Sequence, residues 1–129
     1  MENYPRVHAD IDLDAIRYNM EQMHHLTDPH TKLMAVIKTD GYGHGAIPIA
    51  RELEPLDYVY GYAVAAEEEG IALRSAGIKK PILILGYAFP EQYEALLRAQ
   101  ITPAVFTLEA AQRLSETAKR LGLSAHIHI

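Results

Sequence analysis

Short apolar runs alternate with longer segments of helical period along the whole chain. Runs rich in β-branched and apolar residues occupy residues 7–11, 33–37, 58–63, 81–85, 102–106 and 125–129. In the segments between them, apolar residues recur at helical spacing, so a predicted helix follows each predicted strand except the last. Strands and helices that alternate in this order are typical of βα units around a parallel sheet. The sequence therefore predicts an α/β fold.

The predicted helices carry residues that commonly begin and end helices. Asp12 and Thr107 are suited to cap helix N-termini, and Pro90 suits a first helical turn. Gly77 and Gly122 stand where helices are expected to end. In the first and last helices, we expect the inward-facing residues to be Leu13, Ile16, Met20 and Met23, and Leu108, Ala111, Leu114, Ala118 and Leu121.

The spacing of the predicted strands suggests part of a barrel. Strand ends near residues 37, 62, 85, 106 and 129 give a repeat that fits a (β/α)8 barrel. A complete barrel of this type usually needs about 250 residues, whereas this chain has 129. We therefore expect an incomplete TIM-type (β/α)8 barrel, truncated after about five barrel strands. A self-sufficient open sheet of flavodoxin type is the alternative.

Composition narrows the possible partners. The chain has 12 Lys and Arg against 17 Asp and Glu, a formal charge of −5, and no basic stripe, which argues against nucleic acid as a partner. It has no cysteine, which excludes disulfides and thiolate metal sites. No positively charged leader precedes an apolar run, and no segment is long enough to cross a bilayer, so we expect no membrane partner and a cytoplasmic location.

Lys38 follows the apolar run 33–37 directly, and three glycines come within seven residues of it at Gly41, Gly43 and Gly45. Barrel enzymes hold their active sites at the carboxyl ends of the strands. A partly desolvated lysine there can form a Schiff base with an aldehyde cofactor. The hydroxyl of Tyr42 could donate to a phosphate, which the N-terminus of the next helix would also suit. By itself, the pattern also fits a solvated surface lysine.

Four blocks of the sequence resemble a known family. Residues 35–46, Ala-Val-Ile-Lys-Thr-Asp-Gly-Tyr-Gly-His-Gly-Ala, resemble the signature of the alanine racemase family. In that signature Ala-Val-Val-Lys is followed by Ala-Asp/Asn-Ala-Tyr-Gly-His-Gly. The likeness extends upstream to residues 9–16 and downstream to residues 63–70 and 81–86. Ile37, Thr39 and Gly41 depart from the commoner residues without shifting the register.

The resemblance implies both an architecture and an activity. Members are homodimers with an N-terminal barrel and a C-terminal β domain, so residues 1–129 would be the N-terminal part of the barrel domain. Residues 1–12 would include a strand associated with the C-terminal domain. The implied activity is a pyridoxal-5'-phosphate-dependent racemase (an isomerase) that interconverts L- and D-alanine. In bacteria this reaction supplies D-alanine for peptidoglycan, and serine or another small amino acid stays open as the substrate.

The resemblance also implies roles for four residues. Lys38 would hold pyridoxal phosphate as a Schiff base and act as the acid or base on the D-alanine side of the substrate. Tyr42 would hydrogen-bond the cofactor phosphate, while Val36 and Leu85 would pack against the cofactor. The second acid–base group, a tyrosine of the other subunit, would lie outside these residues. We therefore expect the 129-residue chain to be inactive alone.

Other polar groups have simpler explanations. His126 and His128 share one face of a predicted strand but have no evident third ligand, so we predict no metal site. Glu67, Glu68 and Glu69 are expected to form a solvated first helical turn. His44 suits a turn residue bonded to nearby backbone as well as it suits a cofactor contact.

Two further functions compete with the racemase. One is a non-catalytic pyridoxal-phosphate-binding protein of a related barrel family, whose lysine segment lacks the Tyr-Gly-His-Gly stretch present here at residues 42–45. The other is an α/β interaction module without a cofactor.

Overall fold

A four-stranded parallel sheet forms the centre of the computed structural model, which describes residues 7–129. Its strands are β1 (Leu33–Val36), β2 (Val59–Val64), β3 (Ile82–Tyr87) and β4 (Thr102–Ala104). Each strand pairs in parallel with the next one along the chain, in the order β1-β2-β3-β4. Consecutive strands of a βα barrel have this order, whereas a flavodoxin-type sheet reverses its order at a switch point. The parallel βα architecture is therefore confirmed, and the flavodoxin alternative is wrong.

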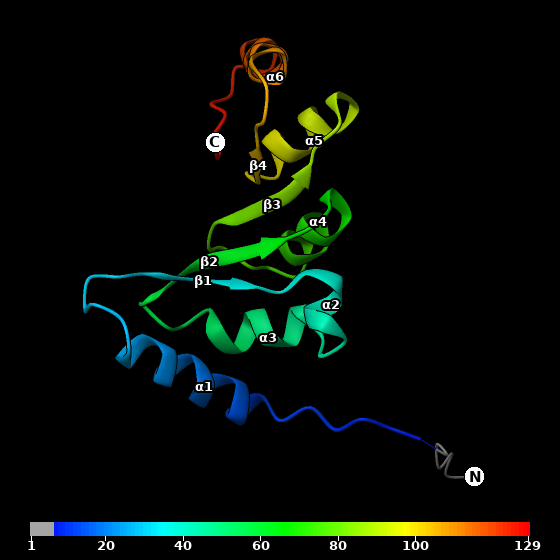
Figure 1. The fold of residues 1–129 in the computed structure, drawn as a ribbon. Helices are drawn as coiled ribbons and strands as arrows, with labels where there is room; N and C mark the ends of the chain where they lie inside the picture. The colour runs from blue at the N-terminus through cyan, green and yellow to red at the C-terminus, as the bar shows by residue number, and fades with distance from the viewer. Residues whose placement is uncertain (1–6) are drawn as a thin grey trace.

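Helices connect the strands, as Figure 1 shows. They are α1 (Leu13–His25), α2 (Lys38–Tyr42), α3 (Ala46–Leu53), α4 (Glu67–Ser75), the 3-10 helix η1 (Pro90–Gln92), α5 (Tyr93–Arg98) and α6 (Leu108–Leu121). Helix α1 lies against α3 at the β1 side of the molecule, and α6 lies beside α5 beyond β4 (Figure 1). The predicted helices are thus all present.

The predicted helix ends are also confirmed. The side chain of Asp12 accepts a hydrogen bond from the backbone N–H of Ala15 at 3.0 Å. The side chain of Thr107 accepts one from Ala110 at 3.2 Å. Gly122 ends α6 in the left-handed conformation with φ 67°. These contacts satisfy backbone groups that a helix leaves without partners at its ends.

Alternate strand residues face the helices and form the core, because side chains along a strand point to opposite faces. The largest fully buried side chains are Leu53, Val59, Tyr62, Val64, Leu73, Ile78, Ile82, Ile84, Leu96, Pro103 and Leu114. The other face of the sheet is less covered: Val36 is 43% exposed and Leu85 is 42% exposed. The sheet thus has one face packed by helices and one face that is partly open.

The predicted strand at residues 7–11 does not form. Residues 7–12 have no strand conformation and are exposed. Isolated strands are unstable because their N–H and C=O groups need a neighbouring strand, and none pairs with these residues in the described structure. Residues 1–6, which belong to the same predicted segment, lie outside the described residues.

The last predicted strand, residues 125–129, forms only an isolated parallel bridge between Ala104 and His128. The N–H of Val105 donates to the carbonyl of His128 at 2.8 Å, and the N–H of His128 donates to Pro103 at 3.1 Å. Its neighbour β4 has three residues, so it offers few groups to a fifth strand. The described residues therefore contain four barrel-type strands and the beginning of a fifth.

Two of the predicted inward-facing residues point outward instead. Met23 is 57% exposed at the end of α1, and Leu108 is 75% exposed at the start of α6. Both lie in the terminal turns of their helices. Separately, no helix within residues 7–129 combines the length and apolar character needed to cross a membrane.

Candidate functional site at the carboxyl edge of the sheet

Lys38 lies at the carboxyl edge of the sheet, directly after β1. The preceding residue, Ile37, is 3% exposed, and its N–H donates to the carbonyl of Ala63 in β2 at 2.9 Å. Lys38 itself is half-buried, and its Nζ lies 5.9 Å from the centre of the Tyr42 ring. The sheet therefore fixes the backbone at Lys38 and presents its amine beside a phenol.

The four residues after Lys38 form one left-handed turn. The φ angles are 55° at Thr39, 51° at Asp40, 62° at Gly41 and 57° at Tyr42. For residues other than glycine this conformation costs about 1–2 kcal/mol each, and it is least expected of a β-branched residue such as Thr39. Strained backbone persists only where surrounding contacts hold it, and it clusters at functional sites.

Hydrogen bonds within the turn and to the next helix stabilise this conformation. The carbonyl of Asp40 accepts from the N–H of Gly45 at 2.8 Å, and its side chain accepts from Ala46 at 2.9 Å. Gly41 is packed closely, because a Cβ there would lie 2.8 Å from Cδ1 of Ile49. The turn is thus anchored on the first turn of α3.

Glu69 of α4 contacts the same turn, which the sequence analysis did not predict. One carboxylate oxygen of Glu69 accepts from the N–H of Thr39. The other accepts from the N–H of Ala65 at 2.7 Å and of Ala66 at 3.1 Å. The prediction of a solvated glutamate run is therefore wrong for Glu69, which is half-buried, although it holds for the exposed Glu68. The sequence could have indicated the contact with Ala66. A glutamate at the third position of a helix often accepts from the N–H of the residue before the helix.

Val36 and Leu85 lie on the open face of the sheet. The register pairs Val36 with Ala63 and Ala63 with Leu83, so these residues share one face, and Leu85 follows on the same face two residues later. Both side chains are partly exposed near the strand ends, which is consistent with packing against a ligand. Close to them, a Cβ on Gly86 would lie 2.4 Å from the carbonyl oxygen of Ala65. The absence of a side chain at Gly86 therefore lets β2 and β3 approach closely at this edge.

His44 contacts backbone that is close to it in the sequence. Nδ1 of His44 lies 3.3 Å from the carbonyl oxygen of Tyr42, which matches the simpler expectation of a turn residue bonded to backbone. Within residues 7–129, no group of three or more His, Cys, Asp or Glu side chains is placed to hold a metal ion.

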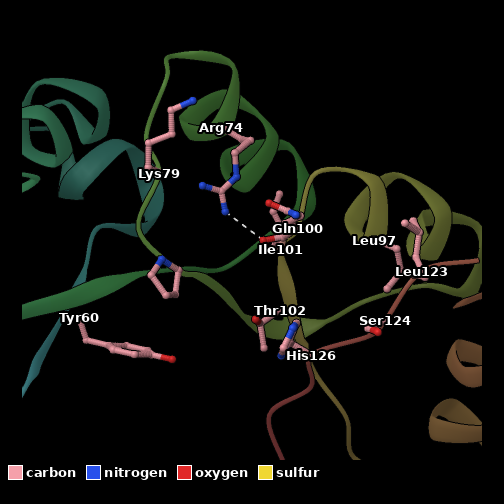
Figure 2. Close-up of a pocket in the computed structure, with 11 residues that line it drawn as sticks. Tyr60, Arg74, Lys79, Leu97, Gln100, Ile101, Thr102, Leu123, Ser124 and His126 are labelled. Carbon is pink, nitrogen blue, oxygen red and sulfur yellow. Dashed lines mark hydrogen bonds between the residues drawn. The ribbon is translucent and has the colours of Figure 1, made fainter.

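A cavity lies away from Lys38, at the amino ends of the strands. Its volume is about 470 Å³, and Figure 2 shows Arg74 and Tyr60 on opposite sides of it. The guanidinium of Arg74 donates to four carbonyls, those of Ile78, Lys80, Ala99 and Gln100, at 2.6 to 3.2 Å. Burial lowers the pKa of Arg74. The cavity is thus bordered by an arginine whose contacts hold the loops before β3 and β4.

A second buried group reinforces this amino end. The hydroxyl of Tyr62 donates to the carbonyl of Ala50 at 2.8 Å and lies 3.0 Å from the carboxylate of Glu54. Burial, followed by the contact with Glu54, raises the pKa of Tyr62. The other oxygen of Glu54 accepts from the N–H groups of Lys79 and Lys80 at 2.7 and 3.0 Å.

Comparison with known proteins identifies the family. The model of the alanine racemase N-terminal domain matches residues 11–129. The alanine racemase of Desulfovibrio desulfuricans is 44% identical over 123 residues, which cover 95% of this chain and 33% of that protein. The solved alanine racemase of Clostridium difficile 630 matches with a TM-score of 0.89 and 44% identity, over 92% of this chain and 31% of that one. A histidine racemase from Leuconostoc mesenteroides subsp. sake has a TM-score of 0.82 at 26% identity, over 97% of this chain and 34% of that one.

The chain therefore spans about a third of the length of the relatives that it matches. Within that third, the matched region includes β1 to β4 and the turn after Lys38. The parallel βα order, the sequence motif around Lys38 and the match over residues 11–129 agree. This chain belongs to the alanine racemase family.

Proposed function

We propose that these 129 residues carry the lysine side of the active site of a pyridoxal-phosphate-dependent alanine racemase. The observation that carries the proposal is the position of Lys38 at the carboxyl edge of a parallel sheet, at the start of a strained turn. Barrel enzymes place their catalytic residues at this edge. This chain spans only about a third of the length of its relatives. The activity of the whole enzyme is therefore inferred from the family match.

The donor set at this edge suits pyridoxal phosphate. A primary amine, Lys38, reacts with an aldehyde, and the phenol hydroxyl of Tyr42 can donate to a phosphate. Val36 and Leu85 present apolar surface on the open face of the sheet, which suits an aromatic ring. When bound, this cofactor withdraws electrons from the α-carbon of an amino acid and so makes its hydrogen acidic.

Each of these side chains then has a distinct task. The amine of Lys38 would hold the cofactor, and it would serve as the acid or base on the D-alanine side of the α-carbon. The hydroxyl of Tyr42 would hold the cofactor through its phosphate. Val36 and Leu85 exclude water from one side of the ring, which strengthens electrostatic interactions there.

Racemisation also requires an acid–base group on the opposite side of the α-carbon. The family resemblance assigns that group to a tyrosine of a second subunit, outside these 129 residues. We therefore propose that the active enzyme is a cytoplasmic homodimer that supplies D-alanine for peptidoglycan, and that this chain alone does not racemise alanine.

A different amino acid is the second candidate for the substrate. The likeness to the histidine racemase favours this candidate, because the fold of that protein matches 97% of this chain. The higher identity to alanine racemases favours alanine. The non-catalytic cofactor-binding protein is less well supported, since the matched relatives are racemases and the chain retains the Tyr-Gly-His-Gly stretch.

Circular dichroism of L-alanine, L-serine and L-histidine incubated with the whole-length protein and pyridoxal phosphate tests the proposal. We expect the optical signal of alanine to decay fastest, and no decay with the 129-residue chain. Faster decay of the optical signal of histidine or serine would overturn alanine as the proposed substrate. Cofactor binding without any decay would support the non-catalytic alternative.

A further inference from the structure

Glu69 links the segment after Lys38 to the end of the neighbouring strand. Its two carboxylate oxygens are used separately: one accepts from Thr39, and the other accepts from both Ala65 and Ala66. Thr39 is the first residue after Lys38, and Ala65 is the first residue after β2. One side chain therefore connects the carboxyl ends of β1 and β2.

Capping of α4 alone does not explain this arrangement. A glutamate at the third helical position caps its own helix by accepting from the residue before the helix, which here is Ala66. That contact uses one oxygen. The bond to Thr39 joins residues thirty positions apart in the sequence, so it must serve the turn after Lys38 and not the helix to which Glu69 belongs.

The turn needs such a contact because its conformation is unfavourable. Thr39, Asp40 and Tyr42 all have positive φ without being glycine. Asp40 holds the far end of the turn through Ala46, whereas Glu69 holds the near end, next to Lys38. A bond between a backbone N–H and a carboxylate is stronger than one between neutral groups. The first strained residue is thus held by a charged acceptor.

We propose that Glu69 is a positioning residue, whose carboxylate keeps the turn left-handed and thereby holds the amine of Lys38 at the carboxyl edge. Glu69 does not contact the cofactor in this proposal. Its effect on cofactor binding passes through the backbone of Thr39. The expected effect of Glu69 on cofactor binding rests on the proposed function, whereas its effect on the conformation of the turn does not.

The variant Glu69→Gln separates the two contacts. Its amide keeps one acceptor oxygen, and we expect that oxygen to stay on Ala65 and Ala66, where it makes two bonds. The NH2 group would then face the N–H of Thr39, and two donors cannot bond. Glu69→Asp keeps the charge but is one carbon shorter, so it cannot reach both sides. Glu68→Gln is the matched control, because Glu68 is adjacent and exposed.

Amide hydrogen exchange of the intact protein without cofactor tests the structural part. In Glu69→Gln we expect exchange in residues 38–45 to rise about tenfold or more, because a charged hydrogen bond is lost. Exchange in α4 and the melting temperature should stay close to those of Glu68→Gln. Unchanged exchange in residues 38–45 would overturn the proposal, as would equal acceleration in α4, which indicates a general loss of stability.

Titration with pyridoxal phosphate, followed by absorbance, tests the consequence for Lys38. We expect the dissociation constant to rise about tenfold to a hundredfold in Glu69→Gln and in Glu69→Asp, but not in Glu68→Gln. If Glu69→Gln does not fold, Glu69→Asp provides both measurements. Equal affinity in all variants would overturn the positioning role. Absence of binding in the unmodified protein would instead overturn the proposed function, and the exchange experiment would still decide the role of Glu69 in the turn.

Discussion

The two ends of the sheet differ in how their backbone is held. At the amino end, charged side chains bind loop carbonyls and N–H groups: Arg74 contacts four carbonyls, and Lys80 donates to Leu56 and Val59 at 2.9 and 2.6 Å. At the carboxyl end, the chain makes a strained left-handed turn beside a half-buried lysine and partly exposed apolar residues. Charged side chains thus hold backbone groups at both ends, but the strained turn and the half-buried lysine lie at the carboxyl end.

This difference indicates a division of tasks along the strand direction. In βα barrels the amino face supports stability and the carboxyl face carries chemistry. The amino-end contacts here are hydrogen bonds from charged groups to backbone, which stabilise by about 1.5–3 kcal/mol each. Substitutions at the amino end should therefore alter the free energy of unfolding, while substitutions at the carboxyl end should alter cofactor binding and activity.

The largest effect is expected for Lys38→Ala. Loss of the amine should abolish cofactor attachment and lower alanine racemisation by the whole-length protein by at least about 10²–10⁴-fold, the contribution of one acid–base group. The control is Lys32→Ala at the amino end, whose Nζ donates to the carbonyl of Asp57. Comparable losses in both variants would remove the distinction between the two ends.

Arg74→Ala should have the largest effect on stability. Four carbonyls lose a charged donor, and we expect the free energy of unfolding to fall by about 2–4 kcal/mol in urea denaturation. Affinity for pyridoxal phosphate, measured on the folded protein, should not change. Arg74→Lys keeps the charge but lacks the planar fork, so it should recover only part of the loss. A weaker cofactor affinity in Arg74→Ala would show that the ends are coupled.

The sequence was sufficient to predict features that depend on local patterns. The apolar run before Lys38 and the caps at Asp12 and Thr107 were found because each depends on neighbouring residues. The strands expected at residues 7–11 and 125–129 were wrong or incomplete, because a strand forms only where another strand offers partners. The sequence pattern indicates apolar alternation, but it does not indicate whether a neighbouring strand is present.

The candidate site was predictable only in part for the same reason. The motif located Lys38 and Tyr42, whereas the role of Glu69 depends on a contact across thirty residues. The left-handed conformation of Thr39 opposes the preference of a β-branched residue, so propensity predicts the reverse of what the tertiary contacts impose.

Tyr42→Phe should weaken cofactor retention without a large effect on stability. Loss of one hydrogen bond to a charged phosphate is worth about 1.5–3 kcal/mol, which raises the dissociation constant of pyridoxal phosphate about tenfold to a hundredfold. Tyr60→Phe, near the amino end of β2, is the control. A dissociation constant that stays the same in Tyr42→Phe would argue against a phosphate contact.

Gly41→Ala tests the packing of the strained turn. The added Cβ would lie 2.8 Å from Cδ1 of Ile49, and the alanine would have to adopt a φ of 62°. We therefore expect the free energy of unfolding to fall by about 1–2 kcal/mol. Ile49→Val removes the clashing methyl group, and a double-mutant cycle should show that the two changes offset each other in part. If the effects of the two substitutions were strictly additive, Ile49 would not be the residue that excludes a side chain at position 41.

The smallest effect is expected from the ionisation of Tyr62, which lowers the stability of the folded protein at alkaline pH. Its pKa is raised in the folded protein, first by burial and then by Glu54, whereas in the unfolded chain it ionises near about 10. The contribution is fully present below that value and is lost as the pH rises above it. Tyr62→Phe should therefore flatten the alkaline slope of stability, and Tyr18→Phe, at an exposed site, should not.

Lys38 is the residue proposed to attach the cofactor. Reduction of the whole-length protein with borohydride in the presence of pyridoxal phosphate, followed by peptide mapping, measures this directly. We expect the label on the peptide that contains Lys38. A label on Lys32, Lys79 or Lys80 with Lys38 unmodified would contradict the proposed role of Lys38.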